Sequence, residues 1–127
     1  MPDTDRHDNY RRFEAGPDPF GRIWQVEFRW QQTGISIRHA DTVDVKFAVW
    51  TEGPDAEPKQ EKIVALPHLL LLGLSKQTGH ALTDPWCLKL AARHLTFMIT
   101  SGEDLEKSLV TVSAADLDRA GGTLQTA

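Results

Sequence analysis

The feature that most constrains the fold is a strict alternation of apolar and polar residues in the first half of the chain. In "WQVEFRW" (24–30) and again in "VDVKFAV" (43–49), every second residue is large and apolar. A period of two is typical of half-buried strands, because successive side chains point to opposite faces of a sheet. Both segments therefore predict antiparallel strands, and the buried face of the first comprises Trp24, Val26, Phe28 and Trp30.

The turns between these strands are predicted from glycine and polar residues. The dipeptide "TG" (33–34) suits a tight turn, because glycine tolerates positive φ. Continued alternation beyond it would place His39 and Asp41 in the apolar stripe, which requires either a turn at "HADT" or a bulge. We favour the turn, which gives a three-stranded meander in which Ile37 pairs with Val45.

Two helices are expected after the strands. The short apolar run "KIVAL" (62–66) predicts a fourth strand. Pro67 then suits the first turn of a helix, and Gly79 suits its C-terminal exit. The next helix begins with Asp84 as N-cap and Pro85 as the first helical residue.

The C-terminal quarter is less regular. Residues 105–112 can be either strand or helix, although the last three of them favour a strand. The tetrapeptide "SAAD" (113–116) resembles a capping box with Asp in place of Glu, and predicts a short helix that ends at Gly121.

Together these elements predict an α+β fold of one domain. An antiparallel β-meander of three to four strands (about 20–66) is packed on one face by two helices (about 67–78 and 84–100), and a short C-terminal strand or helix follows. The predicted organisation is a disordered N-terminal arm (1–19), a single α+β domain (20–122) and a frayed tail (123–127).

Composition excludes several classes of partner. A net charge of −4 and a pI of about 5.7 argue against nucleic acid, whose phosphates must be neutralised by Lys and Arg. The longest apolar stretch (63–74) is shorter than the roughly 20 residues that a membrane span needs. The polar N-terminus and the single cysteine favour a cytoplasmic protein.

The single cysteine, Cys87, follows Asp84-Pro85-Trp86 near the start of a predicted helix, where the helix dipole can lower a thiol pKa. "DPWC" resembles the start of the active helix of thioredoxin-like proteins, but Leu90 occupies the position of their second cysteine. His94, two turns further on, lies about 10 Å along the helix axis and is too distant to act as a base. We therefore expect Cys87 to be buried and structural.

Two groups of residues could support catalysis. Asp44 and Lys46 lie on one strand face, and this acid-x-Lys spacing resembles half of the restriction-endonuclease-like nuclease pattern. Glu27 or Asp41 could supply the second carboxylate that a hard cation requires. Asp41 could also orient the ring of His39. No pair of histidines has the spacing of a helical zinc site, so no metal or cofactor is predicted.

An interaction surface is the alternative to a catalytic site. Trp50 has the opposite parity from the apolar stripe of its strand, which places it either on the outer face of the sheet, with Ala48 and Arg29, or at a fraying strand end. Trp is a favoured interface anchor. The sequence therefore predicts a small non-catalytic protein-interaction or assembly module that forms a homodimer or binds an unknown protein partner. The alternative is a small metal-dependent hydrolase or nuclease-like enzyme.

Overall fold

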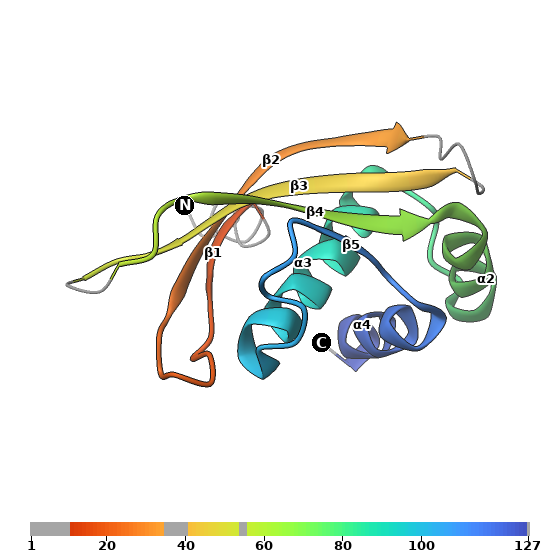
Figure 1. The fold of residues 1–127 in the computed structure, drawn as a ribbon. Helices are drawn as coiled ribbons and strands as arrows, with labels where there is room; N and C mark the ends of the chain where they lie inside the picture. The colour runs from red at the N-terminus through yellow and green to blue at the C-terminus, as the bar shows by residue number, and fades with distance from the viewer. Residues whose placement is uncertain (1–10, 35–40, 54–55, 127) are drawn as a thin grey trace, which may run out of the picture.

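The computed structural model describes residues 11–34, 41–53 and 56–126. It contains a five-stranded open sheet, and Figure 1 shows its helices together on one side of that sheet. This arrangement confirms the predicted α+β class, with a β-meander packed against helices. The strands are β1 (Arg12–Ala15), β2 (Trp24–Gly34), β3 (Thr42–Thr51), β4 (Gln60–Pro67) and β5 (Leu109–Thr111). The helices are α2 (His68–Thr78), α3 (Asp84–Ser101) and α4 (Ala114–Thr126).

The sheet has the strand order β1-β2-β3-β4-β5. The first four strands are antiparallel neighbours, and β5 adds to β4 in parallel. A parallel neighbour requires a crossover connection, and here α2 and α3 form it. The segment 109–111, which was ambiguous between strand and helix, is therefore a strand that closes one edge of the sheet.

The connection between β2 and β3 differs from the prediction. The dipeptide 33–34 lies within β2, where Thr33 pairs with Val43, so the predicted turn at that point is wrong. Val45 lies between Gln31 and Val64, which excludes the predicted pairing with Ile37. Residues 35–40, which include Ile37 and His39, are outside the described residues. Among the described residues, β2 and β3 pair directly with each other, and the middle strand that was expected after the dipeptide 33–34 falls outside them.

A β-bulge between Phe28 and Trp30 explains part of this difference. Phe28 pairs with Phe47 on the helix-covered face, whereas Trp30 pairs with Lys46 on the opposite face. The extra residue in the bulge reverses the alternation, so the prediction that Trp30 is in the buried stripe is wrong. Gln31 takes the inward position instead, and its Nε2 donates to the Asp84 carbonyl at 3.2 Å.

The strand β1 lies in the segment that was expected to belong to the disordered arm. Phe13 pairs with Val26, and Ala15, which is buried, pairs with Trp24. Apart from Phe13 and Ala15 this segment is polar, so it has little local signal for a strand. The partner strand supplies the backbone hydrogen bonds that order it. Residues 1–10 are outside the described residues.

The helix ends show the expected capping chemistry, although the N-cap of α3 and the last residue of α4 differ from the predicted positions. Gly79 and Gly102, both with φ of 77°, end α2 and α3. The N-cap of α3 is Thr83 rather than Asp84, and its hydroxyl accepts from the Trp86 amide. The capping box of α4 is confirmed, because the side chains of Ser113 and Asp116 accept from each other's amides at 3.2 and 3.3 Å. That helix continues past Gly121 to Thr126.

The main core lies between the sheet and α3, as predicted. Ten residues of α3 are buried, among them Leu88, Leu95 and Ile99. They pack against the inward side chains of β2, β3 and β4, which include Trp24, Val26, Val45, Phe47, Val49, Val64 and Leu66. In the part of the chain that the structure describes, no helix combines the length and hydropathy that a membrane crossing requires.

Candidate functional site

The helices cover one face of the sheet, and the opposite face, here called the outer sheet face, has no described helix on it (Figure 1). One row of residues crosses this face from strand to strand. Trp30 pairs with Lys46, Lys46 with Ile63, and Ile63 with Leu109. Leu109 is 57% exposed. Neighbouring strands lie about 4.8 Å apart, so this row extends roughly 14 Å across the sheet.

Lys46 is the one charged residue of this row, but the methylene groups of its side chain also contribute apolar surface. Its Nζ lies 5.4 Å from the ring centroid of Trp30 and 2.8 Å from Oε1 of Glu61. A lysine in this geometry lays its methylene stem along apolar neighbours while the ammonium group meets a carboxylate. The row therefore presents an indole, an aliphatic stem and two branched apolar side chains on a single surface.

Of the residues predicted to form an interface, Arg29 adjoins Trp30 in β2, whereas Trp50 lies four residues along β3 from Lys46, about 13 Å from the row. Trp50 is half-buried on the outer sheet face. The Nζ atom of Lys59 lies 4.4 Å from the centroid of its indole ring, and the guanidinium carbon of Arg12 lies 5.9 Å from the same centroid. Arg29 is exposed at the bulge and contacts Glu27 at 3.2 Å. Ala48 is only 2% exposed and is covered by its neighbours. Trp50 and Arg29 are therefore accessible to a partner, whereas Ala48 is not.

The predicted catalytic carboxylates do not converge. Glu27 lies opposite Ala48, four residues along β3 from Asp44, a separation of about 13 Å. Asp44 accepts from the Thr42 hydroxyl at 2.8 Å, and Lys46 is paired with Glu61. Asp41 is exposed just before β3, and His39 is outside the described residues. Among the described residues, no group of three or more His, Cys, Asp or Glu side chains could hold a metal ion.

Cys87 is buried in the core, with 2% of its surface exposed. Burial raises the pKa of its thiol to about 11, and the nearby carboxylate of Asp84 acts in the same direction. Its own amide donates to the Thr83 carbonyl, so it makes the first backbone hydrogen bond of the helix. The expectation that Cys87 is a packed apolar residue is confirmed, and the thiolate that nucleophilic chemistry requires is disfavoured.

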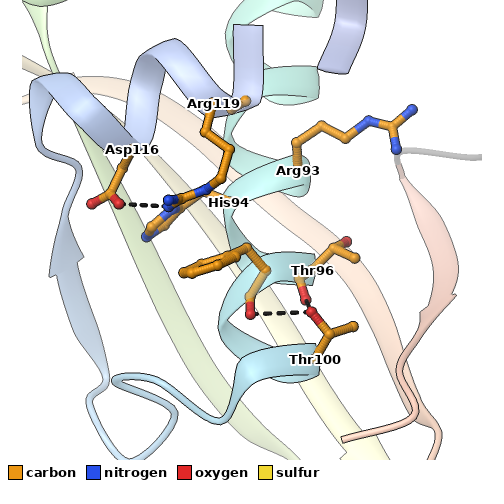
Figure 2. A pocket seen from close by; sticks show the side chains of 8 residues that line it. Arg93, His94, Thr96, Thr100, Asp116 and Arg119 are labelled. Atoms are coloured by element: carbon orange, nitrogen blue, oxygen red, sulfur yellow. Dashed lines mark hydrogen bonds and ion pairs between the residues drawn. The ribbon is translucent and has the colours of Figure 1, made fainter. Parts of the chain in front are cut away.

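A second feature is a cavity of 220 Å³ between α3 and α4 (Figure 2). Its lining comes from one face of each helix: Arg93, His94, Thr96, Phe97 and Thr100 of α3, and Asp116, Arg119 and Ala120 of α4. Figure 2 shows Asp116 and Arg119 facing His94, whereas Arg93 extends to the other side. Asp116 and Arg119 form an ion pair at 2.6 Å. The guanidinium carbon of Arg119 lies 3.7 Å from the ring centroid of Phe97.

His94 is the unusual member of this lining. It is 4% exposed, and neither of its ring nitrogens has a hydrogen-bond partner among the described residues. The Phe97 ring stacks beside it at a centroid distance of 6.2 Å. Burial lowers the pKa of His94 from 6.5, against the opposing effect of Asp116, so the imidazole is neutral at pH 7. A neutral imidazole has one N–H donor and one bare acceptor nitrogen.

The sequence contains one signal for this site, in the position of His94 along its helix. His94 lies three residues after Ala91 and four before Met98, within the apolar stripe of the helix. At helical spacing, such a histidine must point into the core. Its distance from Cys87 and the metal-ligand spacings of the histidines do not distinguish a buried histidine from an exposed one.

Lys62 is a further buried titratable group, and it lies on the helix-covered face of the sheet. It is 2% exposed opposite Phe47, and burial lowers the pKa of its ammonium group. Its Nζ donates to the backbone carbonyls of Leu105 and Lys107, the latter at 2.7 Å. These bonds attach the loop between α3 and β5 to the sheet, so we assign Lys62 a structural role.

Comparison of the chain with protein-family models, with curated proteins and with solved structures found no match.

Proposed function

We propose that this protein is a small non-catalytic interaction module that self-associates through its outer sheet face. The observation that carries the proposal is the cross-strand row of Trp30, Lys46, Ile63 and Leu109 on a face without a described helix. Interfaces are enriched in such aromatic and apolar anchors at their centre, with charged residues at the rim. Trp50 supplies a second indole on the same face.

The charges on this face favour a second copy of the chain as the partner. Arg12, Arg29 and Lys59 lie on or beside the strands that also bear Glu14, Glu27 and Glu61. In a two-fold symmetric dimer the same patch meets itself, so both signs of charge must be present on it. A face of mixed charge can place the cations of one protomer opposite the carboxylates of the other. A patch of a single sign would repel its own copy.

The test is the oligomeric state of matched leucine variants. Leu109→Glu introduces a carboxylate into the proposed interface, and we expect it to convert a dimer into a monomer in light scattering over a dilution series. Trp50→Ala should weaken the dimer at least tenfold if the indole is a central anchor, because such anchors contribute about 2 kcal/mol or more. The control is Leu69→Glu on α2, because Leu69 is 68% exposed but lies away from this face.

Two results would contradict the proposal. One is a wild-type chain that remains monomeric at every concentration. The other is a dimer that Leu69→Glu dissociates and Leu109→Glu does not, which would place the contact on the helical side. Circular dichroism of each variant separates loss of association from loss of folding.

A further inference from the structure

The contact between α3 and α4 carries an inference that is independent of self-association. His94 of α3 faces α4, and neither of its ring nitrogens reaches solvent or has a hydrogen-bond partner among the described residues. A neutral imidazole tolerates this enclosure better than an imidazolium, because the charged ring has two N–H donors and a full charge to satisfy. Burial accordingly lowers the pKa of His94 from 6.5. The docked position of α4 therefore disfavours the proton on this ring.

The charged groups of α4 that face the ring provide no acceptor for a protonated imidazole (Figure 2). Asp116 is paired with Arg119 at 2.6 Å through one oxygen, and its other oxygen accepts from the amide of Ser113. The guanidinium carbon of Arg119 lies 3.7 Å from the ring centroid of Phe97. The charge of Arg119 opposes a second cation on His94, whereas the charge of Asp116 favours it.

Further charged groups come from α3 and from the loop that follows it. Glu103 and Asp104 in that loop favour the protonated ring through their charges, but neither forms a hydrogen bond with it. Arg93 of α3 has an interaction of its own, and Figure 2 shows it directed away from His94. Burial outweighs all of these charges in its effect on the ring. Protonation is therefore favourable only when α4 moves away and water reaches the imidazole.

The attachment of α4 allows it to separate without the rest of the domain. This helix follows β5 and packs chiefly on α3 and α2 (Figure 1). Of its described side chains, two apolar ones, Leu117 and Ala120, are buried. Its Gly121 approaches α2 so closely that a Cβ atom there would lie 2.9 Å from Cδ2 of Leu74. Most of the core lies between α3 and the sheet, and that part does not depend on α4.

We propose that protonation of His94 and docking of α4 on α3 exclude each other, so that mildly acidic pH releases α4 from the rest of the fold. One proton passes from solvent to the exposed imidazole, and the Asp116–Arg119 pair leaves with the helix. The released state binds one more proton than the docked state. Docking is therefore strongest above pH 6.5, the ordinary pKa of histidine, and weakens by up to about tenfold for each pH unit below it.

The experiment measures amide hydrogen exchange of the full chain by NMR at pH 7 and at pH 5.5. Protection factors are compared, because they correct for the pH dependence of exchange itself. The amides of Leu117 and Ala120 report on α4, and the amide of Val45, in the middle of the sheet, reports on global unfolding. A released helix of 13 residues exchanges readily, because an isolated helix of this length is marginal in water.

We expect the α4 amides to be less protected than Val45, and their protection to fall by about eightfold between the two pH values. His94→Leu should remove this pH dependence, because no proton can bind at that position. The matched control is His80→Leu, which removes an exposed histidine and should retain the dependence.

Three outcomes would overturn the proposal. Equal protection of the α4 amides and Val45 would show that α4 opens only when the whole domain unfolds. Constant protection of α4 in the wild type would show that Asp116 turns to accept from the protonated ring while α4 stays docked. A pH dependence that survives His94→Leu would assign the effect to another group. The wild-type measurement remains decisive even if His94→Leu does not fold.

Discussion

At the scale of single residues, Asp18 shows how one side chain can order a loop. Its Oδ1 accepts from the amides of Phe20 and Arg22 at 2.9 and 2.8 Å. Its Oδ2 accepts from Nε of Arg22 and Nε1 of Trp24 at 2.8 and 2.9 Å. Burial alone would raise the pKa of Asp18, but these hydrogen bonds lower it from 3.8 to about 2. The carboxylate thus connects the loop between β1 and β2 to the core through Trp24.

We expect Asp18→Asn to lower the free energy of unfolding at pH 7 by about 1–3 kcal/mol, because an amide cannot accept from all four donors. The folded-state pKa lies below the unfolded value of 3.8. The contribution of Asp18 is therefore complete above pH 3.8 and is lost as the pH falls through about 2. Urea denaturation as a function of pH measures both effects, and the variant should lose less stability over that range than the wild type.

The control for this prediction is Asp118→Asn on α4, where the carboxylate is exposed. It should change the free energy of unfolding by less than about 0.5 kcal/mol. If Asp18→Asn behaved like this control, Asp18 would not anchor the loop.

At the scale of the elements, the bulge in β2 determines which face each aromatic residue occupies. Strict alternation predicts that Trp24 and Trp30 share the buried face, yet only Trp24, at 2% exposed, is in the core. After the bulge, Trp30 packs beside Lys46 on the outer sheet face. A one-residue insertion reverses every later side chain of a strand. Propensity and parity do not locate such an insertion, because it depends on how the strand pairs with β3.

Substitution of the two tryptophans distinguishes the observed register from strict alternation. We expect Trp24→Ala to cost about 3–5 kcal/mol, the usual effect of emptying a core site of an aromatic ring. Trp30→Thr should cost about 1 kcal/mol or less, because threonine suits an exposed strand position. Urea denaturation at low protein concentration measures both. A Trp30→Thr variant as unstable as Trp24→Ala would show that Trp30 is in the core.

At the scale of the whole molecule, the sheet and α3 enclose one continuous core, and Cys87 lies within it. With 2% of the residue exposed, a reagent gains effective access to the thiol only when α3 separates from the sheet. Because α3 contributes ten buried residues, that separation amounts to unfolding of the domain. The reactivity of this one thiol therefore reports on the integrity of the entire fold.

We expect iodoacetamide to modify Cys87 in the native protein at least about a hundredfold more slowly than in urea at pH 7. A pKa of about 11, against 9.0 for a free thiol, reduces the thiolate by that factor even before burial limits access. Mass spectrometry of quenched samples measures the rate, and Leu95→Ala, which weakens the core, should increase it. Rapid modification of the native wild type would contradict the enclosed core.

The candidate site was less predictable than the fold. Parity alone indicated that Trp50 and Arg29 face away from the core, and the structure agrees. The row of Trp30, Lys46, Ile63 and Leu109 could not be predicted, because it requires the bulge in β2 and the parallel addition of β5. The α3–α4 cavity depends on where α4 packs, and that contact joins residues distant in the chain.

The sequence by itself determined that 24–30 and 43–49 form strands, from a period of two, that α2 and α3 are helices, from their capping residues and apolar stripes, and that Cys87 is buried. Each of these follows from backbone geometry and solvation that act over a few residues, so a local pattern is sufficient. Only the tertiary structure decided the strand β1, the face of Trp30 and the enclosure of His94 without a hydrogen-bond partner among the described residues. These features depend on contacts between distant segments, which supply or withhold the hydrogen bonds and apolar neighbours that a local pattern does not specify.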